Sequence, residues 1–315
     1  MGATSHDIHI DALLSEMAID YRPEGFIADR IFPIVDVDKQ FNMFTVFDRR
    51  DVLTPVIAER APGTPARQVT REVGSDLYSC KNFALSYPVT LEDRGNMDPI
   101  FVSKLYDRGA EYLLDLLALG WEQRTAYQVT SGSNVGSYSA VSSAWSGAGN
   151  PLADVNQAID NVTASNGVAP SDVTFGWDAW KSFRRDSTVR NLIFGVNNGG
   201  GYPTEAQVAQ LLNVKRVTVG GGFLNTAGRG QTEVLRSIWG DNVLVYYRPD
   251  APTIDRPSFG YAFRWNRPGI PNMVVERHPY DSRAKAELVE VGYYQDEKIT
   301  ARSYGFLLRA VNSST

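Results

Sequence analysis

The pattern of apolar and polar positions between residues 41 and 130 changes from strand-like to helical. Residues 41–47 (FNMFTVF) are rich in aromatic and β-branched side chains, and within residues 77–91 (LYSCKNFALSYPVTL) apolar side chains recur at every second position from residue 83 onward. Alternation with a period of two is typical of a strand with one covered face. The two segments are therefore predicted to flank an extended excursion of the chain.

The tip of this excursion is polar. Residues 59–71 (ERAPGTPARQVTR) carry Arg60, Arg67 and Arg71, with Val69 as the apolar anchor. A segment of this composition is either a disordered loop or a tip that becomes ordered on binding another molecule. In an assembly, the three arginines would contact carboxylates of the next subunit.

A helix of about thirty residues, or about 45 Å, is predicted to follow Asp98 and Pro99. Asp98 can cap free N–H groups, and Pro99 suits the first helical position. One face keeps a spacing of three or four residues, at Val102, Leu105, Gly109, Leu113, Leu116 and Gly120. The middle, residues 113–121, is apolar almost all round and is expected to be covered on several sides. An extended excursion beside a long, rigid helix suits contact with neighbouring molecules better than enclosure of a substrate.

Further helices and strands are predicted before and after this region. A short helix is expected at residues 10–19, followed by an extended arm. A flexible Ser/Gly-rich connection is predicted at 131–150 and a helix at 151–164. From residue 173 strands and helices alternate, with strands at 173–176, 214–219, 234–239 and 243–247, a helix at 177–194, and a short helix opened by a capping box of Thr204 and Gln207. The C-terminal part is extended, with strands at 259–266, 273–277, 286–293 and 304–311.

Composition excludes several classes of protein. The net charge of −5 argues against a protein whose main task is to grip nucleic acid. The one cysteine, Cys80, rules out an internal disulfide framework and a cysteine-based zinc site. No secretory signal is evident, and no segment approaches the roughly 18 apolar residues that span a bilayer. We expect a soluble protein without a membrane partner.

Candidate catalytic and metal-binding residues are few. His6 and His9 lie near two aspartates at the N-terminus without zinc-motif spacing, and His278 lies in a predicted loop without an obvious partner. Neither a Ser-His-Asp set nor a GxSxG motif is present. We therefore expect no catalytic, cofactor-binding or metal site, and no enzyme activity.

The glycine-rich segments 195–202 and 220–230 supply no phosphate-binding motif, because neither has the lysine or the strand-to-helix spacing that such loops need. They are interpreted as flexible loops at a subunit edge. The glycines concerned are Gly199, Gly200, Gly201, Gly220, Gly221 and Gly222.

The order of these segments resembles that of major capsid proteins of tailed bacteriophages with the Hong Kong 97-type shell fold. The resemblance covers nearly the whole chain and rests on the order of the segments and on their local sequence character. The matching segments are 12–37 (ALLSEMAIDYRPEGFIADRIFPIVDV), 60–69 (RAPGTPARQV), 93–99 (DRGNMDP), 173–193 (VTFGWDAWKSFRRDSTVRNLI), 211–227 (LLNVKRVTVGGGFLNTA), 237–249 (SIWGDNVLVYYRP) and 303–311 (SYGFLLRAV).

The resemblance implies an α+β, Hong Kong 97-like capsid fold with four parts. These would be an N-terminal arm (1–40), an extended β-hairpin loop (41–95), a peripheral domain with a long spine helix (96–171 and 258–315) and an α/β axial domain (172–257). It also implies hexamers and pentamers that close an icosahedral shell around double-stranded DNA in a virion assembled in the bacterial cytoplasm. The glycine loops would lie near the symmetry axis of each ring.

The resemblance also implies further partners: a portal, a separate scaffolding protein because the arm begins almost at Met1, and in some cases a decoration protein. Lysine–asparagine cross-linking is not expected, since the extended loop has one lysine, Lys81, on a strand flank. Two alternatives remain open. One is an encapsulin-like compartment, which particle contents would distinguish, and the other is an α/β enzyme built on residues 173–250.

Overall fold

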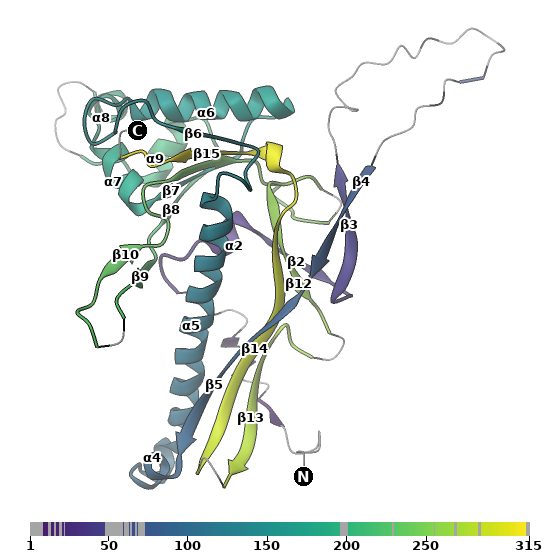
Figure 1. Ribbon diagram of the computed structural model, residues 1–315, viewed down its shortest axis with the longest axis vertical. Coiled ribbons are helices and arrows are strands. Elements are labelled where there is room, and N and C mark those ends of the chain that lie inside the picture. The colour runs from purple at the N-terminus through teal and green to yellow at the C-terminus, as the bar shows by residue number, and fades with distance from the viewer. Residues whose placement is uncertain are drawn as a thin grey trace.

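The computed structural model describes residues 9–11, 14–15, 17–18, 21, 23–47, 59, 63, 65–66, 68, 73–195, 201–228, 230–254, 256–267, 270–282 and 285–312. Within them the chain is a mixed helix and strand structure elongated along one helix, with an α/β layer at one end (Figure 1). The α+β class predicted from the sequence is therefore confirmed.

The long helix is α5, Val102–Thr130, whose 29 residues correspond to about 44 Å. It follows a 3-10 turn, Pro99–Phe101, closed by a backbone bond of 2.8 Å from Phe101 N to Asp98 O. The expected cap by the Asp98 side chain is wrong, since that side chain makes no capping hydrogen bond. The side chain that caps is Thr90, whose Oγ1 accepts from Asp93 N at the start of the short helix α4, Leu91–Gly95.

A six-stranded sheet lies along α5 (Figure 1). Its central strand β14 (Ala286–Ile299) is long enough to pair with three neighbours. The other strands are β1 (His9–Ile10), β2 (Ile34–Val37), β5 (Lys81–Thr90), β12 (Gly260–Trp265) and β13 (Met273–Asp281). Apolar residues of α5, including Tyr106, Leu113 and Leu117, pack on Val275, Val289 and Val291 of one sheet face. This packing explains why every second residue of β14 is buried.

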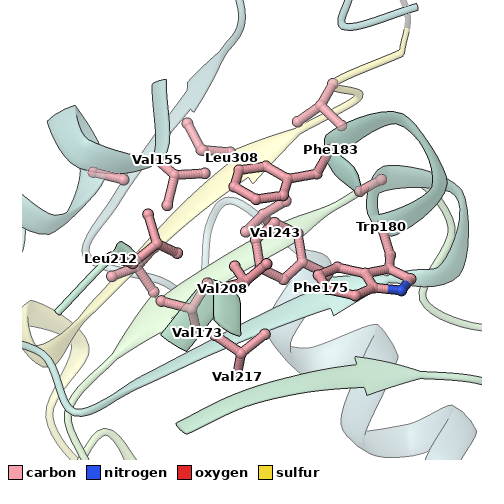
Figure 2. Packing of buried hydrophobic residues seen from close by; sticks show 14 of the residues in the cluster. Val155, Val173, Phe175, Trp180, Phe183, Val208, Leu212, Val217, Val243 and Leu308 are labelled. Carbon is pink, nitrogen blue, oxygen red and sulfur yellow. The ribbon is translucent and has the colours of Figure 1, made fainter. Parts of the chain in front are cut away.

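A second, five-stranded sheet forms the α/β layer, in the order β6-β15-β11-β7-β8. The strands are β6 (Ser137–Ala140), β7 (Asp172–Gly176), β8 (Arg216–Gly220), β11 (Val243–Tyr246) and β15 (Gly305–Arg309). Its helices are α6 (Pro151–Asn166), α7 (Trp177–Arg185), α8 (Ser187–Phe194) and α9 (Glu205–Leu211). Figure 2 shows the apolar core of this layer, in which Phe175, Trp180 and Phe183 meet the valines of β7 and β11.

Several local expectations change in this layer. The segment 131–150, expected to be a flexible connection, contributes strand β6, which pairs in parallel with β15 from the C-terminal end. The single helix expected at 177–194 is two helices, because Asp186 adopts an extended conformation and caps α8 by accepting from Val189 N at 3.0 Å. The capping box of Thr204 and Gln207 at α9 is confirmed.

The two layers join through a further apolar core. Trp121, Ala126 and Val129 near the end of α5 pack with Phe259 and Leu307, together with the short helix α2 (Ala28–Ile31). Strands β11 and β15 are thus covered on both faces, which accounts for their nearly continuous apolar sequences.

Two hairpins extend from this body. The larger consists of β3 (Phe41–Phe47) and β4 (Val73–Ser79) and forms a two-stranded sheet of its own at one side of the molecule (Figure 1). The smaller consists of β9 (Phe223–Asn225) and β10 (Leu235–Ser237). A two-stranded sheet is marginal by itself. The larger hairpin is held by Phe44 and Tyr78, whose rings pack on Phe263 of β12.

Candidate functional site

The cysteine is placed where nucleophilic chemistry is disfavoured. Cys80 is buried and its thiol donates to the carbonyl oxygen of Phe263 at 3.4 Å. Burial raises the pKa of the Cys80 thiol to about 12. Since the thiolate is the reactive form, Cys80 acts as a small core residue of the hairpin junction.

His278 differs from its prediction. It lies in strand β13 rather than in a loop, and its Nε2 is 3.0 Å from Glu290 Oε2 and 4.0 Å from Glu276 Oε2. The local pattern indicates a strand end here because Pro279, which cannot donate to a strand ladder, follows His278. Proline is tolerated where a ladder hydrogen bond is already missing, and the register between His278 and Asp281 is irregular.

The predicted tip arginines, Arg60, Arg67 and Arg71, lie outside the described residues, as do Gly199 and Gly200. Gly201 is described, and a side chain on it would contact the Phe194 ring. The carbonyl oxygen of Gly201 accepts from Arg190 Nε at 3.2 Å.

The glycines at 220–222 are packed rather than free. A side chain at Gly220 would overlap the indole of Trp239, and one at Gly222 would crowd Ile238 and Phe26. Gly221 N donates to Gly25 O at 3.0 Å, which joins the loop to the N-terminal segment. The expectation of a flexible loop does not hold for these three residues, because here glycine permits close approach of backbones.

The long helix is covered on part of its circumference. Of the residues expected on its covered face, Leu113 is buried, Leu105 is half-buried and Leu116 is 38% exposed. The expectation that residues 113–121 are covered on several sides holds in part, since only Asp115 and Leu116 of this segment are exposed. The reason is that the sheet and the N-terminal segment pack on adjoining sides of α5 and leave Asp115 and Leu116 on the remaining side exposed.

Glu122 of α5 binds two other parts of the chain. Its carboxylate accepts from Ile27 N at 3.0 Å and Ala28 N at 2.8 Å, where α2 begins, and from Trp239 Nε1 at 2.5 Å. The residue is 1% exposed, and this burial raises the pKa of the Glu122 carboxyl to about 7 against the opposing effect of the three donors. Glu122 thus fixes the N-terminal segment and the α/β layer to the long helix.

A half-buried arginine also joins α5 to the sheet. Arg124 Nη2 donates to Glu297 Oε1 at 3.0 Å and to the Tyr293 hydroxyl at 3.1 Å, and its guanidinium lies 3.7 Å from the centre of the Phe83 ring. Gln295 connects Glu297 to Arg264 by further hydrogen bonds. Because each buried charge has partners, this network fixes the position of the helix on the sheet.

The outer face of the β3–β4 hairpin is apolar and exposed. Phe41 and Met43 are 59% and 60% exposed, and Leu77 is paired with Met43 across the strands. The inner face carries Phe44 and Tyr78, which are buried. A two-stranded sheet with apolar side chains on both faces has one face left to cover.

A second exposed apolar area lies along α5 and β5. Leu85 and Tyr87 of the edge strand are exposed beside Tyr112 and Leu116 of the helix, and the Tyr87 and Tyr112 rings meet edge to face at 6.1 Å. Further exposed apolar side chains gather where α5 begins, with Ile100 at 84%, and on the β9–β10 hairpin. Such clusters mark surfaces that contact other proteins.

Sequence reasoning missed Glu122, Arg124 and the outer face of the hairpin. Glu122 directly follows the apolar segment 113–121 and lies four residues before the buried Ala126, and this register was the signal for a buried carboxylate. The hairpin signal was present in residues 41–47, where apolar side chains occur at both odd and even positions. In the part of the chain that the structure describes, no helix has the length and apolar character needed to cross a membrane.

Comparisons with known proteins agree with this geometry. No family model matches the chain. The major capsid protein of Pseudomonas phage JBD67 is 27% identical over 308 residues, which cover 94% of this chain and 95% of that protein. A solved phage-related protein from Bordetella bronchiseptica RB50 is 21% identical, with a TM-score of 0.74 over 96% of this chain and 97% of the other. The capsid of cyanophage P-SCSP1u is 11% identical, with a TM-score of 0.60 over 93% and 90%.

Proposed function

We propose that this chain, which has the Hong Kong 97-type phage capsid fold and resembles phage major capsid proteins over nearly its whole length, is the major capsid protein of a tailed phage. The observation that carries the proposal is the match along the full chain, since 94% of it aligns with a major capsid protein. The exposed apolar hairpin and helix faces support it, because a shell subunit must cover such surfaces with other copies.

In this proposal, copies of the chain form hexamers and pentamers that close an icosahedral shell. The α5 rod and its sheet supply a stiff wall, because Glu122 and the Arg124 network hold the helix against its neighbours. The β3–β4 hairpin reaches away from the body and presents Phe41 and Met43 to an adjacent copy. Symmetry repeats each such contact at every subunit, so modest contacts sum to a stable shell.

The loop residues have proposed roles in the same assembly. Arg60, Arg67 and Arg71 would contact carboxylates of the adjacent subunit. The glycine segments, including Gly201 and Gly220, would lie near the ring axis. A separate scaffolding protein and a portal complete the proposed partners.

Packaged DNA is proposed to be held by confinement. The net charge of −5 does not favour a tight grip on phosphates. The exposed Arg185 and the neighbouring Arg184 and Arg190 would soften repulsion if their side of the shell faces inward. We therefore predict weak duplex binding, without sequence preference, that disappears at physiological salt. Fluorescence anisotropy checks this, and tight sequence-selective binding at that salt would contradict it.

A closed compartment that holds a protein cargo is the competing use of this fold. Particle contents distinguish the two. The chain is expressed in a phage-infected or lysogenic host and the particles are purified after nuclease treatment. Protected double-stranded DNA supports the capsid proposal, whereas particles that hold one enzyme and no DNA support the compartment.

A further inference from the structure

Three potential metal ligands share one face of the six-stranded sheet, on the side away from α5. Glu276 and His278 are two residues apart on β13, so their side chains point to the same face. Glu290 of β14 lies directly opposite Glu276 in the antiparallel register. Ser86 of β5 lies opposite Glu290 on its other side, which places an exposed hydroxyl in the same row.

The ligand atoms of this cluster lie close together. His278 Nε2 is 3.0 Å from Glu290 Oε2 and 4.0 Å from Glu276 Oε2, and one atom from each of the three residues lies within 4.8 Å of the others. Two ligands of a tetrahedral zinc ion are about 3.4 Å apart, given bond lengths near 2.1 Å. Small rotations of the two glutamate side chains therefore bring the three ligand atoms to the spacing of a zinc site without movement of the strands.

The two carboxylates of the cluster give it an excess of negative charge. Two carboxylates directly opposite on neighbouring strands repel each other. Within the described part of the chain, the ion contacts of Glu276 and Glu290 are those with His278. Arg267 lines the same hollow as the two carboxylates and stacks on the Tyr294 ring, with 4.9 Å between the guanidinium carbon and the ring centre. A single imidazole between two carboxylates leaves a net negative site.

The surface beside the cluster has room for an ion and its water ligands. A hollow of about 160 Å³ reaches both carboxylates and is lined by the small residues Ala84 and Gly292. A side chain at Gly292 would lie 3.1 Å from the Ala84 Cβ and fill it. The register irregularity just after His278 turns the end of the strand.

We propose that Glu276, His278 and Glu290 bind a divalent cation of the zinc class on this sheet face. One imidazole and two carboxylates suit Zn²⁺, and Mn²⁺ is expected to bind more weakly. Water or the Ser86 hydroxyl completes the coordination. Ca²⁺ and Mg²⁺ are disfavoured because they need more oxygen ligands than the site offers. The ion links β13 to β14 and offsets the repulsion between the two glutamates.

The test uses the full untagged chain after removal of metals with a chelator. Isothermal titration with ZnCl₂ is expected to show saturable binding at one ion per chain, and CaCl₂ is expected to show none. Glu290→Gln and His278→Gln should each weaken zinc binding by more than about 100-fold, which is the upper end of the loss usual for an outer-shell partner. Glu111→Gln, on the exposed side of α5, removes one negative charge elsewhere and serves as the matched control.

A second control addresses the N-terminal histidines. The double variant His6→Ala/His9→Ala should bind zinc as the parent chain does. Absence of saturable zinc binding in the parent overturns the proposal, and so does binding that is lost in this double variant but kept in Glu290→Gln and His278→Gln.

A stability measurement gives an independent readout. Without metal, Glu276→Gln should melt at a higher temperature than the parent, because the repulsion is removed. With saturating ZnCl₂, the parent should gain stability and the variant should not. A variant that melts below the parent without metal and gains equally with zinc would overturn the site. Both readouts use the unassembled chain, so they succeed or fail independently of shell formation.

Discussion

The α/β layer and the β3–β4 hairpin use similar residues in opposite ways. In the layer, the valines of β7 and β11 lie under helices and are fully buried, as Figure 2 shows for Val173 and Val243. In the hairpin, Phe44 is buried but its neighbours Phe41 and Met43 are more than half exposed. The layer is complete as a single chain, whereas the hairpin presents a face that another molecule must cover.

The largest change in unfolding free energy is expected in the core of the α/β layer. Phe175→Ala removes a ring that contacts Trp180 and Phe183 at the centre of the core. The loss should be about 3–5 kcal/mol of unfolding free energy. Urea unfolding of the unassembled subunit measures it, and a loss below about 1 kcal/mol would show that this core is not tightly packed.

The opposite outcome is expected on the hairpin. Met43→Asp places a charge on the exposed face, so assembly should fail while the unfolding free energy changes by no more than about 0.5 kcal/mol. The matched control, Asn156→Asp, adds the same charge on the exposed polar side of α6 and should assemble. Sedimentation velocity follows both, and assembly of the hairpin variant at parental yield would remove the contrast.

The junction between the two regions should respond to pH. The pKa of Glu122 is raised to about 7 from 4.5, so the folded chain holds this proton more tightly than the unfolded chain. The stability that this proton contributes is complete below about pH 4.5 and is lost as pH rises through about 7. Glu122→Gln carries no titrating proton and should flatten the decline across that window.

Urea unfolding at about pH 5 and about pH 8 brackets the window. Glu111→Gln, with its exposed carboxylate replaced, should keep the parental pH dependence. An unchanged decline in Glu122→Gln would mean that another group is responsible.

The smallest effect is expected at the tip arginines. Replacement of Arg60, Arg67 and Arg71 with alanine should lower the yield of shells without changing the fold, because exposed ion pairs contribute only about 0.2–1 kcal/mol each. Counting assembled particles of the variant and the parent by electron microscopy checks this. A parental yield in the triple variant would exclude these arginines from assembly.

Periodicity made the main elements predictable. The α5 helix, the β14 strand and the capping box at Thr204 follow from spacing alone, since each depends on local hydrogen bonding and one apolar face. The pairing of β6 with β15 could not be predicted, because it joins residues 137–140 to 305–309, far apart in sequence. Local pattern does not specify which distant strand supplies the partner.

The functional surfaces were less accessible to sequence reasoning. Leu116 and Leu113 look alike in the sequence, yet one is exposed and the other buried, because the sheet lies on one side of α5. The partners of His278 depend on the register between β13 and β14, which the sequence does not encode locally. Side chains on two strands become a cluster only when the pairing is known.

Cryo-electron microscopy of assembled particles tests the central claim most directly, by showing what covers the outer face of the hairpin. The account predicts that Phe41, Met43 and Leu77 are buried against an adjacent copy of the chain, while the α/β core around Phe175 is unchanged from the single subunit. Particles in which these three side chains still face solvent would contradict it.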